Sequence, residues 1–254
     1  MHTIFLQILS NLANDYGDSV HGADNQDRQG PSRTVQSGII TKPQMLRAMV
    51  ILGLLSLASG VLLLYISLGL NVESFVFFFV LGILCILAAV TYTVGRRPYG
   101  YAGLGDLSVL LFFGFTGVMG SYYLFVNEVD WIVVLPAMSC GLFSVGVLNL
   151  NNTRDIESDK KAGKFSIPVR IGRERAKVYQ WVLLVGGMLT VSVYAALEFM
   201  AIQQWLFALS FPLFIINGIK LSKASDPKEM DPLLKQLALS TLVFVILFGI
   251  GASL

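Results

Sequence analysis

The chain has 254 residues, of which 55% are hydrophobic and 13% are charged, and its formal net charge is +2. Soluble domains carry about 25% charged residues, so this composition excludes a soluble globular enzyme and also a disordered or fibrous chain. The small net charge indicates no nucleic acid partner. The two cysteines, Cys85 and Cys140, lie in apolar runs and predict neither a disulfide framework nor a metal–thiolate site. We therefore expect an integral membrane protein whose surroundings are the lipid bilayer.

Seven apolar stretches are long enough to cross the roughly 30 Å of hydrocarbon in a bilayer, which takes about 20 helical residues. They cover residues 46–68, 74–94, 106–126, 131–150, 178–197, 200–219 and 236–253. Their length favours helices over the short alternating segments of a β-barrel, so the predicted fold class is an all-α membrane protein. An eighth apolar stretch, residues 1–14, would reach only about 21 Å as a helix and is too short to span.

The basic residues lie on one side of the predicted spans. Three short loops contain no Lys or Arg, namely residues 69–73, 127–130 and 198–199. The other connections contain all 18 basic residues and lie near residues 15–47, 95–106, 151–177 and 220–235. By the positive-inside rule these four connections are cytoplasmic. Both termini then lie on the far side, which requires an even number of helices and makes the short first segment the remnant of an eighth span.

Two clusters of acidic and amide side chains stand at the cytoplasmic ends of predicted helices that are four spans apart. The first cluster has the spacing i, i+3, i+4 and i+7 of a single helix face, and its members are Asn11, Asn14, Asp15 and Asp18. The second has the spacing i, i+4 and i+8, and its members are Asn151, Asp155 and Asp159. Their shared Asn-x-x-x-Asp register indicates an internal repeat, which transporters also use.

Four carboxylates at the rim of a helix bundle repel each other, and burying each one costs about 2.5–3.5 kcal/mol at mid-membrane and less near the interface. A divalent cation removes this cost, and oxygen ligands favour Mg²⁺, which binds one or two carboxylates together with substrate phosphates. The two clusters are therefore predicted to hold Mg²⁺ and to clamp a diphosphate. The simplest alternative is a pair of solvated helix ends with ordinary capping Asn and Asp.

Basic residues near both clusters suit a phosphate group, because Arg grips phosphate in a planar fork and Lys acts as a point charge. Arg33 follows the first cluster, whereas Arg154 and Lys160 belong to the second. Three other basic residues are interpreted as cytoplasmic topology anchors, namely Lys161, Lys164 and Arg173.

Five stretches of the sequence carry a family resemblance. They read NLANDYGD (11–18), DRQGPSR (27–33), QSG (36–38), YTVGRRPYGYAGLGD (92–106) and NNTRDIESD (151–159). These stretches resemble the UbiA-type intramembrane prenyltransferases, and within that family the branch that prenylates a naphthoate in menaquinone biosynthesis. The resemblance runs from about residue 5 to the end of the chain.

The resemblance implies a single transmembrane prenyltransferase domain over residues 1–254, in a family of nine helices around a lipid-accessible cavity. Only seven full transmembrane helices and a short N-terminal one are expected here, so we expect an N-terminal truncation that removes the family's first helix. The resemblance also implies Mg²⁺, a polyprenyl diphosphate donor and a 1,4-dihydroxy-2-naphthoate acceptor. The expected products are demethylmenaquinol, CO₂ and diphosphate.

The resemblance assigns roles to individual residues. It implies metal ligation by Asn14, Asp15, Asp18, Asp155 and Asp159. It places Tyr92 and Arg96 near the diphosphate, at i and i+4 on one helix end. Tyr92 is expected to be catalytic together with the four aspartates, whereas the residues expected to bind substrate include Arg96, Asn11, Asn14 and Asn151. The broader family often has a further Asp where this chain has Gly22, and Asp24 is the candidate replacement.

Two other functions remain open at this point. Prenylation of 4-hydroxybenzoate or another phenol uses the same metal motifs, and only residues 27–38 and 92–106 favour the naphthoate. An ion-coupled transporter would also have intramembrane acids and a repeat, but here the carboxylates lie at one face and none lies mid-span. The expected location is the inner membrane of a bacterium, with the active site facing the cytoplasm.

Overall fold

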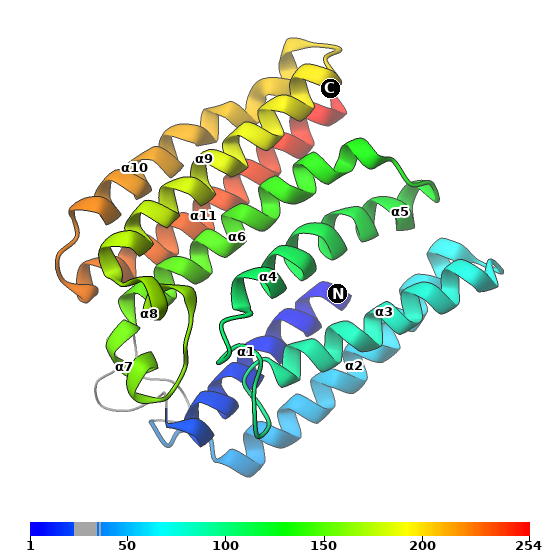
Figure 1. The fold of residues 1–254 in the computed structure, drawn as a ribbon. Coiled ribbons are helices and arrows are strands. Elements are labelled where there is room, and N and C mark those ends of the chain that lie inside the picture. Colours follow the sequence, from blue (N-terminus) through cyan, green and yellow to red (C-terminus); the bar gives the residue numbers. More distant parts are fainter. Residues whose placement is uncertain (23–34, 36) are drawn as a thin grey trace. The chain divides into compact units, whose positions relative to one another are not determined.

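A computed structural model describes residues 1–22, 35 and 37–254, and all regular elements within these ranges are helical (Figure 1). Among the described residues, seven helical segments are long and apolar enough to cross a membrane, which confirms the predicted all-α membrane protein. These segments are Lys42–Leu68, Val72–Thr91, Gly105–Val126, Trp131–Arg154, Arg173–Leu197, Ile202–Lys223 and Pro227–Ser253.

The chain forms two compact units. The N-terminal unit comprises Met1–Gly105, Leu124–Asn127 and Glu157–Phe165. The C-terminal unit comprises Asp106–Tyr123, Glu128–Ile156 and Ser166–Leu254.

The N-terminal unit is built on three helices that pack against one another, namely α1 (His2–His21), α2 (Lys42–Leu68) and α3 (Val72–Thr91). Leu9 and Ala13 of α1 are buried against Met45 and Met49 of α2. The apolar start of the chain and the first acidic cluster belong to one uninterrupted helix, α1. Helix α1 ends where Gly22 adopts the left-handed conformation at φ 76°, which glycine tolerates without strain.

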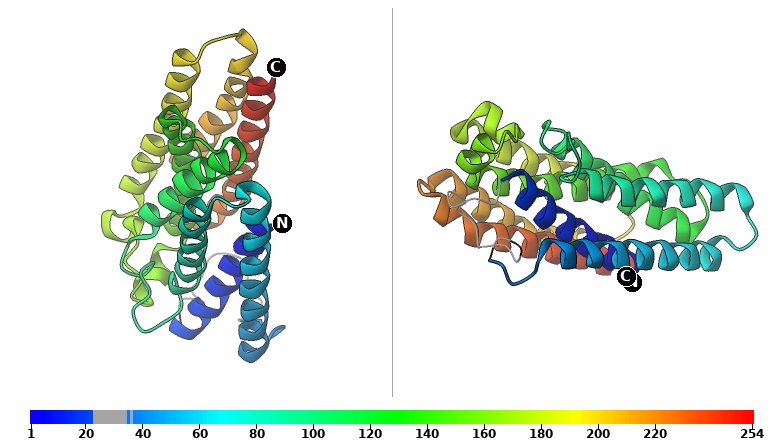
Figure 2. Two further views of the ribbon diagram at one scale, coloured as in Figure 1. Left: turned by 90° about the vertical axis from the view of Figure 1, so that its right-hand side faces the viewer. Right: turned by 90° about the horizontal axis from the view of Figure 1, so that it is seen from below.

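The C-terminal unit is organised around α6 (Val134–Arg154), which packs against α9 (Arg173–Leu197) and α11 (Pro227–Ser253) (Figures 1 and 2). Phe143 lies at the centre of its core, stacked on Phe214 with ring centroids 4.1 Å apart and edge-on to Phe244 at 5.0 Å. Around these helices lie η3 (Ile202–Ser210), α10 (Phe211–Lys223), and the short α7 (Ile156–Lys161), α8 (Ile167–Ile171) and η2 (Trp131–Val133).

The span over Gly105–Val126 is not a regular α-helix throughout. It consists of α4 (Gly105–Val109), a π-helical stretch η1 (Leu110–Met119) and α5 (Gly120–Val126). A Cβ on Gly114 would lie 2.8 Å from the Ala137 carbonyl oxygen and 3.0 Å from Gly141 Cα. Small residues are required here because the backbones of η1 and α6 approach closely, a common arrangement in membrane helix packing.

Candidate active site

The first acidic cluster lies on the last turns of α1, as the spacing predicted. Asn11 is exposed, Asn14 and Asp15 are half-buried, and Asp18 is 4% exposed. Gln7 Nε2 donates to Asn11 Oδ1 at 3.4 Å. Burial therefore increases along the stripe toward Asp18, whose charge is the most shielded from water.

A close contact holds this end of α1 against the segment that follows α3. A Cβ on Gly17 would lie only 2.5 Å from the Thr93 carbonyl oxygen, so glycine is required between the two acidic residues of the motif. Thr93 Oγ1 donates to the Ala13 carbonyl at 2.8 Å and approaches Asn14 Oδ1 at 3.3 Å. These contacts fix the position of α1 along and about its axis relative to Thr93, and with it the positions of the carboxylates on α1.

Asp18 is linked to Asp159 within the N-terminal unit through two residues that the sequence analysis did not assign to the site. The Tyr101 hydroxyl donates to Asp18 Oδ1 at 2.8 Å. Lys164 Nζ lies 5.9 Å from the centre of the Tyr101 ring and 3.3 Å from Asp159 Oδ1. The Phe165 N–H donates to the Tyr101 carbonyl at 2.9 Å, which holds the two segments together.

The interpretation of Lys164 as a cytoplasmic topology anchor did not include its burial or its ion pair. Lys164 is 7% exposed and ion-paired with Asp159, because the turn after α7 folds its side chain inward. Tyr101 lies inside the family-like stretch 92–106, so its position was signalled by the resemblance. No spacing rule connects it with Asp18, which is 83 residues away.

The second acidic cluster does not follow one continuous helix. Helix α6 ends at Arg154, Asp155 is the capping residue with φ −95° and ψ 15°, and α7 begins at Ile156. The predicted i, i+4, i+8 stripe is therefore interrupted before Asp159. Neighbouring side chains diverge on a regular helix, and the break allows Arg154 to bind the adjacent Asp155 through both carboxylate oxygens.

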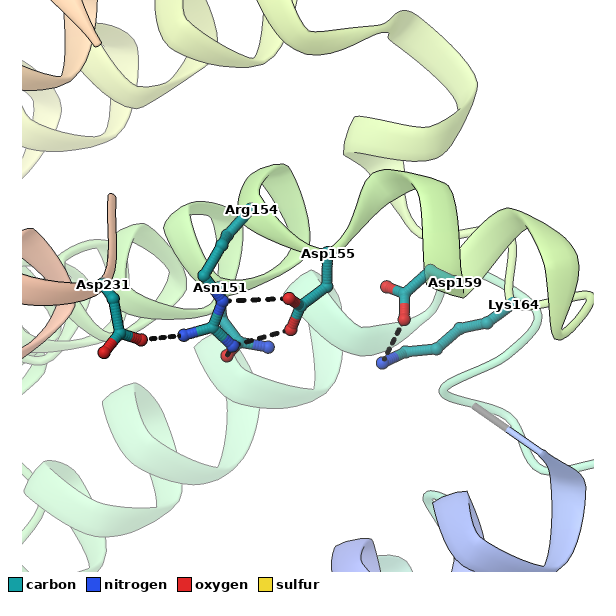
Figure 3. A network of polar contacts seen from close by, with 6 residues as sticks. All are labelled: Asn151, Arg154, Asp155, Asp159, Lys164 and Asp231. Atoms are coloured by element: carbon teal, nitrogen blue, oxygen red, sulfur yellow. Dashed lines mark hydrogen bonds and ion pairs between the residues drawn. The ribbon is translucent and has the colours of Figure 1, made fainter. Parts of the chain in front are cut away.

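Arg154 is a buried side chain at the centre of a polar network in the C-terminal unit (Figure 3). Its guanidinium donates to Asp155 at 2.9 and 2.6 Å, to Asn151 Oδ1 at 2.9 Å and to Asp231 Oδ1 at 2.5 Å. Asp231 belongs to α11 and was not identified by the sequence analysis, because 77 residues separate it from Arg154. The predicted phosphate-binding residue Arg154 thus has its donors directed at protein acceptors.

Tyr92 and Arg96 are not on one helix end. Helix α3 ends at Thr91, and Gly95 then takes a φ of 119°. Tyr92 packs edge-on against Tyr99 with ring centroids 5.3 Å apart, whereas Arg96 is exposed. The glycine breaks the helical register on which the i, i+4 pairing depended.

The remaining predicted residues have varied positions. Lys160 is exposed on α7, and Gly22 forms the end of α1 described above. Arg33 and Asp24 lie outside the described residues, so their predicted roles stay predictions.

The donor chemistry of these residues fits Mg²⁺. Carboxylate and amide oxygens are its preferred protein ligands, and Mg²⁺ needs only one or two carboxylates when a substrate supplies phosphates. In the described part of the chain no three Asp, Glu, His or Cys side chains gather as a ready-made metal site. Asn152, three residues before Asp155 in the chain, is 2% exposed, and its Oδ1 has no hydrogen-bond partner among the described residues.

Comparison with known proteins identifies the family of the chain. Residues 1–250 match the UbiA prenyltransferase family, so the chain belongs to that family of membrane enzymes. A solved structure of digeranylgeranylglyceryl phosphate synthase in membranes has the same fold, with a TM-score of 0.59 at 21% identity. The match covers 100% of this chain and 84% of that one.

Three relatives share a more particular description. The 1,4-dihydroxy-2-naphthoate octaprenyltransferase of Escherichia coli (strain K12) is 44% identical over 97% of this chain and 80% of its own length. The protein so described in Haemophilus influenzae is 43% identical, over 98% of this chain and 80% of its own. The protein so described in Mycobacterium tuberculosis is 35% identical, over 96% of this chain and 80% of its own.

Proposed function

We propose that this protein transfers a polyprenyl group from a polyprenyl diphosphate to 1,4-dihydroxy-2-naphthoate, releasing diphosphate and CO₂ and giving demethylmenaquinol. The observation that carries the proposal is the 44% identity, over 97% of the chain, to an enzyme described by that acceptor. The two aspartate clusters supply the chemistry that departure of a diphosphate requires.

Mg²⁺ is the proposed metal, and the residues that would hold it are Asn14, Asp15, Asp18, Asp155 and Asp159. When bound, Mg²⁺ would supply positive charge against the negative charge that grows on the leaving diphosphate. Asp18 is pre-positioned for this role, because it is buried and the Tyr101 hydroxyl fixes one of its oxygens. Outer hydrogen bonds of this kind orient metal ligands and raise metal affinity.

Basic side chains near the clusters are proposed to bind the donor. Lys160 is exposed on α7 and is available to a phosphate, and Arg33 has the same proposed role. Cleavage of the allylic C–O bond creates a carbocation, which water would quench. An apolar lipid environment of the kind that the seven apolar spans of the described residues require would exclude water while the electron-rich naphthoate ring attacks.

The proposed location is the bacterial inner membrane with the site facing the cytoplasm. The loops without Lys or Arg, such as residues 69–73 and 127–130, would face the opposite side. Asp18, Asp155 and Asp159 all lie next to connections that contain the basic residues.

The direct test is an acceptor comparison on the purified protein in detergent or liposomes. With a polyprenyl diphosphate and Mg²⁺, we expect prenylated product and CO₂ from 1,4-dihydroxy-2-naphthoate and little or no product from 4-hydroxybenzoate. Product from the benzoate alone would replace the proposed acceptor. Release of diphosphate without any transfer, or no release at all, would contradict the prenyltransferase assignment.

The metal assignment has its own test. We expect turnover to be abolished by Asp15→Ala, Asp18→Ala, Asp155→Ala and Asp159→Ala, each measured at saturating Mg²⁺ on protein that still inserts in the membrane. Glu128→Gln is the matched control, because Glu128 lies in a predicted loop on the opposite side. Normal turnover in any two of the four variants would overturn the assignment.

A further inference from the structure

One guanidinium group joins the second acidic cluster to α11. Arg154 Nε donates to Asp155 Oδ1 at 2.9 Å, and Nη2 donates to Asp155 Oδ2 at 2.6 Å. On its other edge, Nη1 donates to Asp231 Oδ1 at 2.5 Å (Figure 3). All three residues belong to the C-terminal unit, so Arg154 is shared between two carboxylates of one compact body.

The two carboxylates that share Arg154 differ in their surroundings. The Asp155 side chain is 6% exposed and that of Arg154 is 4% exposed, whereas the Asp231 side chain is 41% exposed. A guanidinium has five N–H donors, and with Asn151 Oδ1 as a further acceptor four of them are used here. The charges of the buried Arg154–Asp155 pair therefore balance each other, and Asp231 adds a second, more exposed anion.

Asp231 is not needed to cap the helix on which it lies. The N-terminus of α11 is capped by Asp226, whose carboxylate accepts from the Lys228 N–H at 2.8 Å. Glu229 completes the cap by accepting from the Ser225 N–H at 2.9 Å. The carboxylate of Asp231 is directed instead at Arg154, so its role concerns the guanidinium.

A cation bound at Asp155 would change which carboxylate can balance the charge of Arg154. Both Asp155 oxygens now accept from the guanidinium, and a divalent cation on the same carboxylate would repel that positive charge. An Arg this deeply buried needs an anionic partner at all times, because an uncompensated buried charge is strongly destabilising. Asp231 already meets that need on the opposite edge of the guanidinium.

We propose that Asp231 is a positioning residue that holds Arg154 through Nη1 and so leaves Asp155 available to a divalent cation. This inference rests on the proposed function, in which Asp155 is a metal ligand. Arg154 thereby balances the Asp155 charge before the cation arrives and stays paired with Asp231 afterwards.

The test measures cation binding without substrate. Mn²⁺ replaces Mg²⁺ because the electron paramagnetic resonance signal of free Mn²⁺ reports its dissociation constant on the detergent-purified protein. We expect Asp231→Asn to raise the Mn²⁺ Kd about tenfold, the lower end of typical effects for groups that orient a metal ligand. Asp231→Glu should restore the Kd to within about twofold of the original. Glu174→Gln removes a carboxylate that is 83% exposed in the same unit and should change nothing.

A second background separates positioning from simple charge. If Asp231 acts through Arg154, then Asp231→Asn has no further effect on the Mn²⁺ Kd once Arg154→Gln is present. An equal loss in both backgrounds would mean that Asp231 acts by its own charge or as a ligand, and it would overturn the proposal. An unchanged Kd in Asp231→Asn alone, or no Mn²⁺ binding by the unmodified protein, would also overturn it.

Two further outcomes decide the proposal. Thermal melting checks each variant, and an Asp231→Asn protein that does not fold would assign Asp231 a purely structural role and refute positioning. Failure of the unmodified protein to prenylate the naphthoate would overturn the proposed function, whereas the Mn²⁺ series is measured without that reaction. The two failures are therefore distinguishable.

Discussion

Replacing Gly17 by Ala is expected to displace the first acidic cluster, because the backbone beside it leaves no room for a Cβ. A Cβ at this position would lie 2.5 Å from the Thr93 carbonyl oxygen and 2.6 Å from both the carbonyl carbon and Cβ of Thr93. Two of these three atoms are backbone, so no rotamer change relieves the contact. Reaching an ordinary separation of 3.4 Å requires α1 or the segment at Thr93 to move by about 0.9 Å.

The energetic cost follows from the contacts that this movement affects. Overpacking costs about 1–3 kcal/mol, and weakening the Thr93–Ala13 hydrogen bond adds about 0.5–1.5 kcal/mol. The better helix propensity of Ala offsets about 1 kcal/mol. The net loss of about 0.5–3.5 kcal/mol, with a midpoint of about 2 kcal/mol, corresponds at that midpoint to a Tm lower by about 4–8 °C for a chain of this size. Because Asp15 and Asp18 flank Gly17, displacing them by about 1 Å should reduce turnover about a hundredfold.

The assay combines thermal melting in detergent with prenyl transfer at saturating Mg²⁺. Gly82→Ala is the matched control, because an added Cβ there meets nothing within 4 Å, and it should leave both quantities unchanged or slightly raise Tm. Original Tm and turnover in Gly17→Ala would refute the close approach of α1 to Thr93.

Three further predictions concern single side chains. Tyr101→Phe keeps the ring beside Lys164 and removes the hydroxyl that donates to Asp18, so turnover should fall about 10–100-fold with little change in Tm. Full turnover in this variant would contradict the orienting role of the hydroxyl. Lys164→Met removes the cation paired with buried Asp159 and should lower the free energy of unfolding by about 3–5 kcal/mol, and Lys164→Arg should restore it. Lys161→Met, at an exposed position, should leave the free energy of unfolding unchanged. Equal melting of the two Met variants would rule out the Lys164–Asp159 ion pair as a source of stability. Phe143→Ala opens a cavity beside Phe214 and should lower the free energy of unfolding by about 3–5 kcal/mol. Phe77→Ala, at a side chain that is 63% exposed, should melt like the original protein. Similar melting of the two variants would argue against Phe143 as the centre of the core of its unit.

The transmembrane helices could be predicted from the sequence because lipid forces each span to satisfy its own backbone hydrogen bonds. Their starts were less predictable where polar residues belong to the helix. The last span was expected from residue 236, whereas α11 begins at Pro227 with Asp226 as its cap. Hydropathy does not detect such a beginning, since capping residues are polar. The π-helical stretch over Leu110–Met119 also has no hydropathy signal, because its residues are as apolar as those of an α-helix.

The second acidic cluster shows where spacing reasoning stops. A helical repeat predicted Asn151, Asp155 and Asp159 on one face, which assumed an unbroken helix. The break at Asp155 accompanies a two-oxygen contact with Arg154, and it comes with the additional partner Asp231 on α11. No local rule predicts that partner, because the contact depends on how α6 and α11 pack.

The amino-acid sequence by itself determined the membrane location, the full spans found among the described residues, the helical first cluster and the family resemblance. These follow from local properties, namely apolar length, residue spacing and motif identity. Only the tertiary structure decided which partner each buried charge has, with Tyr101 on Asp18, Lys164 on Asp159, and Arg154 between Asp155 and Asp231. A buried charge must find a counter-charge or hydrogen bond wherever packing supplies one, and that position is often far away along the chain.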